Sequence, residues 1–324
     1  MVLGNYRIGF STVPTKYYGP YLKERFFGST LDYSDYPQMA RRNDARILQA
    51  LHKFTENAVR LEADFPRVTS QIQNQIFSGP VPYSQFLPQD IDVLYIGEIH
   101  NETRVQDEIV SLVRQLPAIY PGRNIYLAAE VIPTQVDLPV EKNLILTLDD
   151  LAQRMDIAAP LQSIRVVTAA LDAQIPLYGL EDEMVILAAS TPPKHNWPTD
   201  NQFDSYAVSL EGMDLRNRIF ARKIRELQFF DPGALIVVYG GIDHIAYHNS
   251  SALPGLVKGK SFVVQVTVPS FLGVSNPLFA SFSTDETLRQ KFHAFPNNKL
   301  VESWKAPTSF KQLLGNDLMV IVHE

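Results

Sequence analysis

Residues 92–100 of this chain have the sequence DVLYIGEIH, and residues 234–244 have the sequence ALIVVYGGIDH. Each stretch is an apolar run that ends on a Gly-x-x-His motif, Gly97 to His100 in the first and Gly241 to His244 in the second. Neither run alternates with polar residues, which is typical of parallel strands covered on both faces. A glycine has no Cβ and allows a sharp turn after a strand. The two stretches therefore predict parallel strands that are followed by turns carrying a histidine.

Three further apolar runs, NIYLAAE at 124–130, IPLYGLE at 175–181 and SFVVQVTV at 261–268, alternate with helical stretches. The helical stretches suit the crossovers that join parallel strands, and right-handed crossovers would stack them on the faces of a sheet. The predicted fold class is therefore α/β, a mainly parallel sheet flanked by helices. A last apolar run, DLMVIVHE, predicts an edge or returning strand. The crossover helices are predicted over 103–119, 148–174 and 204–230.

The first part of the chain has a different pattern. Tyrosines crowd among Gly and Pro in residues 6–36, which indicates an irregular arm. Apolar residues at helical spacing predict a helix over 39–59, and the four-residue spacing of Val68, Ile72 and Ile76 predicts a second. Prolines at 80, 82 and 88 then break the chain. We therefore predict two parts: the tyrosine-rich arm with its helices, packing on the main domain, over 1–88, and the α/β domain over 89–324.

Composition excludes several classes of function. The 29 Lys and Arg against 35 Asp and Glu give a formal net charge of −6, so a nucleic acid is not the expected partner. Cysteine is absent, which excludes disulfides, thiolate metal sites and a cysteine nucleophile. The segment MVLGNYRIGFSTVP lacks the apolar core of a signal peptide, and no run approaches the ~20 apolar residues of a membrane span. We expect a soluble protein, cytoplasmic or secreted by a leaderless route.

The carboxyl-terminal end of each of these apolar runs carries polar groups of the kinds that take part in catalysis. In open parallel sheets, ligands bind beyond the carboxyl ends of the strands. Glu130 ends one run and has two interpretations: part of a polar site, or a structural acid paired with an arginine. A single histidine in such a turn commonly only satisfies a carbonyl, whereas two at strand ends favour function. The other groups at these ends are His100 and His244, with Glu98, Asp243 and Glu181 as supporting residues.

Arg216 places a guanidinium on the apolar stripe of the helix predicted over 214–230. Two interpretations are open: a structural counter-ion for Glu130 or Asp243, or a group that binds a substrate carboxylate or an oxyanion. His244 and His248 have the i, i+4 spacing of metal ligands, but the Glu of H-E-x-x-H is absent, so His248 more simply ends a turn. Asp182 and Glu183 are expected to cap the helix that follows them.

The order strand-GEIH, strand-AAE, helix with Arg216-Asn217, strand-YGGIDH resembles the erythromycin esterase (EreA)/ChaN-like superfamily, which includes the TIKI/TraB proteins, over residues 92–268. The resemblance implies the same α/β fold. In the esterase branch, it implies a general-base role on water for the first histidine, helped by the Glu, the Arg and the second His, without a necessary metal. In the TIKI branch it implies a metal-dependent peptidase, and in the ChaN branch haem binding.

Together these patterns predict a hydrolase of an ester, lactone or amide bond that acts on a small molecule or a peptide. His100 would take a proton from water, Glu130 would orient it, and Arg216 with His244 would stabilise the oxyanion. A variant with a divalent zinc or manganese ion would use His100, His244 and Glu130 as ligands. Two alternatives stay open: a haem- or ligand-binding protein with a Tyr or His axial ligand, and a secreted effector or toxin module whose arm docks a host protein.

Overall fold

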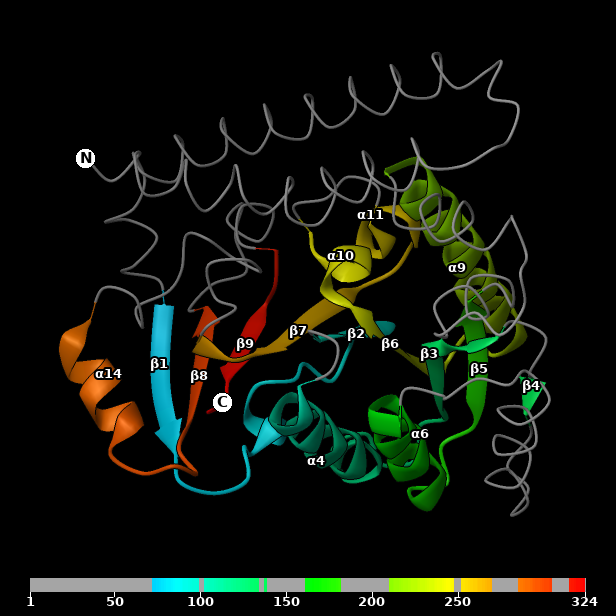
Figure 1. Cartoon of the computed structure of the whole chain (residues 1–324). Helices are drawn as coiled ribbons and strands as arrows, with labels where there is room; N and C mark the ends of the chain where they lie inside the picture. The colour runs from blue at the N-terminus through cyan, green and yellow to red at the C-terminus, as the bar shows by residue number, and fades with distance from the viewer. Residues whose placement is uncertain are drawn as a thin grey trace, which may run out of the picture.

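A computed structural model describes residues 72–98, 102–133, 137–138, 161–181, 210–247, 252–269, 285–304 and 315–323 of the chain. Its centre is a nine-stranded sheet in the order β1-β8-β9-β7-β2-β6-β3-β5-β4 (Figure 1). Six neighbouring strands from β9 to β5 run parallel, and antiparallel pairs close the sheet at both sides. The predicted fold class, a mainly parallel α/β sheet flanked by helices, is confirmed. The strands are β1 (Ile72–Phe77), β2 (Val93–Glu98), β3 (Ile125–Pro133), β4 (Asp137–Leu138), β5 (Leu177–Glu181), β6 (Leu235–Gly241), β7 (Ser261–Thr267), β8 (Lys299–Trp304) and β9 (Leu318–Ile321).

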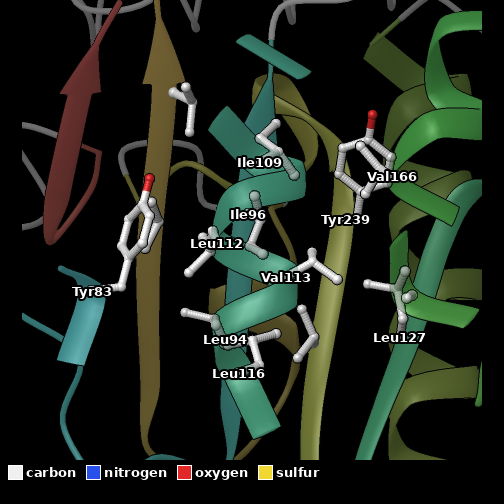
Figure 2. Close-up of a cluster of buried hydrophobic side chains, with 14 of the residues drawn as sticks. Tyr83, Leu94, Ile96, Ile109, Leu112, Val113, Leu116, Leu127, Val166 and Tyr239 are labelled. Atoms are coloured by element: carbon white, nitrogen blue, oxygen red, sulfur yellow. The ribbon is translucent and has the colours of Figure 1, made fainter. Parts of the chain in front are cut away.

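Helices cover both faces of the sheet, which explains why its central strands are apolar without alternation. In Figure 1, α4 (Thr103–Ile119) and α6 (Leu161–Asp172) lie below the sheet, and α9 (Leu210–Phe230), α10 (Ile242–Ile245) and α11 (Leu253–Leu256) lie above it. Leu94 and Ile96 of β2 point into the core on the α4 side (Figure 2), whereas Val93 and Tyr95 belong to the core on the α9 side. The short helix η1 (Tyr83–Gln85) and the peripheral helix α14 (Glu286–His293) complete the described helices.

The connections that leave β2 and β6 pass over opposite faces of the sheet. Strand β2 is followed by α4 on one face and strand β6 by α10 on the other, although the two strands are hydrogen-bonded neighbours. Glu98, the last residue of β2, is paired in register with Gly241, the last residue of β6. Such a divergence is the topological switch point at which α/β sheets bind ligands. Both Gly-x-x-His motifs begin on these two strands.

Two predicted elements differ from the structure. Val68, Ile72 and Ile76 predict a helix, but Ile72–Phe77 form the edge strand β1, antiparallel to β8. A spacing of four also places residues on one face of a strand, whose period is two, so the pattern fits both. Leu318–Ile321 of the run DLMVIVHE form an interior strand, β9, because β8, which the sequence did not predict, extends the sheet beyond it.

Strand β1 and the buried side chain of Tyr83 also bring residues before position 88 into the sheet and its core. The arm and the helix predicted over 39–59 lie outside the described residues. Within the part of the chain that the structure describes, no helix has the length and apolar character needed to cross a membrane.

Candidate functional site

A cluster of charged and polar side chains is buried where β3, β5 and β6 meet α9 and α10. Glu130 lies inside β3, which runs three residues beyond the predicted end of the run, and Glu181 ends β5; α9 supplies Arg216 and Asn217, and α10 supplies His244. Glu130 is 8% exposed, and Glu181, Asn217 and His244 are more deeply buried. We call these five residues the buried polar cluster. Their burial requires that each charge has a partner, because an unpaired charge in a protein interior is very costly.

Arg216 bridges the two carboxylates of the cluster. Its Nη2 donates to Glu130 Oε1 at 2.7 Å, and its Nε donates to Glu181 Oε2 at 2.9 Å. Nη2 also forms an ion pair with Glu181 Oε2. Burial lowers the pKa of Arg216, but the negative charges of Glu130 and Glu181 raise it by more, so the guanidinium is held in its charged form. Arg216 is therefore a counter-ion of both carboxylates.

His244 has hydrogen-bond partners at both ring nitrogens. Nε2 lies 3.1 Å from Glu130 Oε1, and Nδ1 lies 2.5 Å from Asn217 Oδ1. The ring also packs on Phe220, with centroids 5.0 Å apart. An imidazolium donates from both nitrogens in this arrangement, whereas a neutral ring that donates to Glu130 needs the amide NH₂ of Asn217 at Nδ1. In either form, the orientation of the ring is fixed by Glu130 and Asn217.

The second oxygen of Glu130 is held by the backbone of β6. Gly241 N–H donates to Glu130 Oε2 at 2.7 Å. A Cβ on the preceding residue, Gly240, would lie 2.7 Å from the same oxygen, closer than real side chains approach. Glycine at position 240 therefore leaves the space that the carboxylate occupies, and Glu130 is bound by an arginine, a histidine and a backbone amide at once.

The sequence-based reason for the glycines in the two motifs is wrong. Gly241 has φ −61° and ψ 146°, an extended conformation open to any residue, so no sharp turn requires glycine there. A Cβ at Gly97 would collide with the side chain of Ile245, which packs across β2. Close approach of α10 to β2 and of the Glu130 side chain to β6, rather than turn geometry, explains why Gly97 and the neighbouring Gly240 are glycines.

The structure brings together three of the four predicted catalytic residues, Glu130, Arg216 and His244, and adds Glu181 as a direct partner of Arg216. Glu98 is buried at the end of β2, beside Gly241. The remaining predicted positions lie outside the described residues: His100, Asp182, Glu183, His248 and the side chain of Asp243.

Sequence reasoning missed the role of Asn217, which holds the ring of His244. Asn217 is fully buried, and it lies three, four and seven positions before Phe220, Ala221 and Ile224, which are buried on the same helix. That spacing places a polar side chain on the apolar stripe of α9, and a buried polar side chain needs a hydrogen-bond partner. The signal was therefore present in the sequence.

Among the described residues, no group of three or more His, Asp or Glu side chains is arranged to hold a metal ion. A surface groove of about 640 Å³ lies between α4 and α6, with Arg114, Arg165 and Thr168 in its lining. The groove contains none of the predicted site residues, so it is separate from the buried polar cluster.

Comparisons with known proteins give distant similarities. The type III effector HopBA1 is similar over 54% of this chain and 76% of its own, with 15% identity and a TM-score of 0.36. ChaN of Campylobacter jejuni, from a structure of cofacial haem binding, is similar over 72% of this chain and 88% of its own, with 13% identity and a TM-score of 0.37. No protein-family model and no curated protein matches the chain. The superfamily resemblance of the motifs therefore stays a prediction.

Proposed function

We propose that this protein hydrolyses an ester, lactone or amide bond, with His100 as the general base and the buried polar cluster as its support. The observation that carries the proposal is the position of Glu130. Its two oxygens bind Arg216, His244 and Gly241 N–H, at the edge of the sheet where the connections of β2 and β6 diverge. Ligands of open α/β sheets bind at this kind of edge.

The composition of the cluster favours a functional role over a purely structural one. Two carboxylates, one arginine and one histidine are removed from water together, and such buried networks contribute little net stability compared with apolar residues of the same size. Buried, strongly interacting ionisable groups are concentrated at functional sites. An entirely structural network could be replaced by apolar packing, whereas a site that moves protons requires these groups.

His100 is connected to this cluster by a very short chain. It follows Glu98 by two residues, and Glu98 is paired with Gly241, whose N–H binds Glu130. We assign Glu130 to orient the catalytic base and Arg216 to pair with Glu130. Arg216 with His244 stabilises the developing oxyanion.

The metal-free form of this mechanism agrees better with the contacts. Glu130 uses both of its oxygens and His244 both of its ring nitrogens in hydrogen bonds within the protein. Coordination of zinc or manganese by His244 would require its ring to give up one of these hydrogen bonds. We therefore expect hydrolysis to survive exhaustive treatment with a chelator, and complete loss that zinc or manganese restores would identify a metal enzyme instead.

The proposal is tested by measuring turnover of a panel of p-nitrophenyl esters, lactones and p-nitroanilides. We expect His100→Ala to lower kcat by about 10²- to 10⁴-fold, the usual contribution of a general base. His293→Ala is the matched control, since His293 is an exposed histidine at the end of α14 and should keep full activity. The hydrolase proposal fails if no substrate is turned over, or if both variants retain wild-type rates.

The same proteins separate hydrolysis from the haem-binding alternative. Haem added to the wild type would give a Soret band if the protein binds it, and loss of that band in His100→Ala or in a tyrosine variant would identify the axial ligand. A strong Soret band together with absent turnover would replace the hydrolase by a haem-binding protein.

A further inference from the structure

Gln106 carries a buried side-chain amide that is unusual in this core. It is 0% exposed, and neither its oxygen nor its nitrogen has a hydrogen-bond partner among the described residues. Most buried polar side chains are paired, and an unpaired amide destabilises the folded state. Gln115 on the same helix shows the usual condition: its amide donates to Val81 O and Ser111 O and accepts from Tyr83 N–H. The unpaired amide of Gln106 therefore calls for a separate explanation.

The place of Gln106 in the fold indicates what this amide could face. Gln106 lies in the first turn of α4, on a buried face that it shares with Ile109 and Val113, three and seven residues further on. Side chains of a helix lean toward its N-terminus. In α4 that end follows β2 at the carboxyl edge of the sheet. The first turn of α4, and Gln106 with it, therefore lies at the edge at which β2 ends.

Gln106 and the buried polar cluster belong to opposite faces of this edge. Helix α4 leaves β2 over one face of the sheet, and α9 and α10, which carry Arg216 and His244, lie over the other (Figure 1). The switch point between β2 and β6 is therefore flanked by an ionic cluster on one side and by an unpaired amide on the other. A ligand at this edge would lie between groups of different chemistry.

We infer that the Gln106 amide binds an amide group of the substrate, its NH₂ donating to a carbonyl oxygen and its oxygen accepting from the adjacent N–H. This inference rests on the proposed function, and it narrows the substrate from an ester, lactone or amide to a compound that carries an amide or lactam beside the scissile bond. An amide is the complementary partner because it presents one acceptor and one donor side by side. A simple ester offers only the acceptor and leaves the oxygen of Gln106 unpaired, and sites built to bind an N–H reject analogues without it.

The test compares two esters with the same leaving group. The p-nitrophenyl ester of N-acetylalanine has an amide beside the scissile ester, and p-nitrophenyl propionate lacks it. Replacing the amide by an apolar side chain of similar length, Gln106→Met, should lower kcat/KM for the first ester at least about tenfold and change it for the second by less than about twofold. Each ester is compared with itself in the two proteins, so their different intrinsic reactivities cancel. An equal effect on both esters overturns the inference.

Thermal unfolding tests whether the Gln106→Met variant is folded. Because Gln106→Met removes an unpaired buried amide, its thermal midpoint should equal or exceed that of the wild type. Gln115→Met is the matched control on the same helix: it removes satisfied hydrogen bonds, so it should lower the midpoint while leaving the preference between the two esters unchanged. A lower midpoint for Gln106→Met with the ester preference intact would show that the amide is structural, and would overturn the inference.

A binding measurement separates this inference from the hydrolase proposal. N-acetylalanine methylamide, followed by saturation-transfer NMR, should bind the wild type and the Gln115→Met protein, and lose that binding in Gln106→Met. If neither ester is hydrolysed but this pattern of binding is found, the hydrolase proposal fails and the role of Gln106 stands. Absence of binding to the wild type, or equal binding to all three proteins, overturns the role of Gln106.

Discussion

At the scale of single residues, the position of the Glu130 carboxylate depends on Gly240, which has no side chain. The carboxylate reaches Gly241 N–H because position 240 leaves the space open. Glu130 in turn orients His244 and pairs with Arg216, so one glycine affects the geometry of three side chains of the buried polar cluster. The same residue type acts similarly at Gly97, where it admits the side chain of Ile245.

Gly240→Ala should therefore destabilise the folded protein, because the added methyl group disturbs the buried polar cluster. The new Cβ would lie 2.7 Å from Glu130 Oε2, so the carboxylate or β6 must move. Overpacking of this kind typically costs about 1–3 kcal/mol of unfolding free energy, measured by chemical denaturation. Gly79→Ala is the matched control, since a Cβ there meets nothing within 4 Å and should leave stability unchanged. Equal stability of the two variants would show that Glu130 can relocate freely.

At the scale of elements, α4 is joined to two distant segments through Glu108. This buried carboxylate accepts a hydrogen bond from Tyr83 of η1 at 2.8 Å and forms an ion pair with Lys299 at the start of β8. In the sequence, Tyr83 lies 25 positions from Glu108, and Lys299 lies 191 positions from it (299 minus 108). These contacts tie α4, which also carries Gln106, to η1 and β8.

Glu108→Leu should destabilise the protein, because it removes the partner of Lys299 and of the Tyr83 hydroxyl. The side chain of Lys299 is 24% exposed and can reach water, so we expect a loss of about 1–3 kcal/mol, below the 3–5 kcal/mol typical of a fully buried pair. The control is Asp90→Asn, which removes the partner of Lys260 in an exposed pair that should contribute little. Urea denaturation measures both, and an unchanged stability of Glu108→Leu would contradict the structural role.

At the scale of the whole molecule, buried tyrosines make the fold sensitive to alkali. Burial raises the pKa of Tyr120 and of Tyr126 to about 12, the latter with help from Asp231. Burial also raises the pKa of Tyr83, Tyr95 and Tyr247, so these phenols stay protonated in the folded state. In the unfolded chain the same groups titrate near pH 10.

The folded protein should therefore lose stability as the pH rises above about 10, because the unfolded chain releases phenolic protons that the folded chain retains. The stabilising contribution of the protonated phenols is complete below about pH 10. It is lost as the pH rises through about 12, the pKa of Tyr120 in the folded protein. We expect the part of the tyrosinate absorbance that comes from these five phenols to appear in the same cooperative step as the loss of far-ultraviolet circular dichroism. Titration of all tyrosines before any unfolding would contradict the burial of these side chains.

Much of the fold could be predicted from local patterns. The uninterrupted apolar runs located β2, β3, β5, β6 and β7, and the stretch 103–119 coincides with α4, because strands covered on both faces and amphipathic helices have strong local signals. Strand β1 was mistaken for a helix, and β8 was missed. A half-exposed edge strand such as β1, and an antiparallel addition such as β8, depend on pairing with distant partners.

The sequence by itself determined the fold class, the strands whose ends carry polar groups, and the grouping of Glu130, Arg216 and His244 as candidates. Only the tertiary structure decided which atoms meet: that Glu181 shares Arg216, that Asn217 holds His244, and that Gly240 makes room for Glu130. The physical reason is the separation along the sequence between the residues that interact. Burial and helical or strand period are properties of a short window of sequence, whereas hydrogen bonds and close approaches join residues that lie 27 to 111 positions apart.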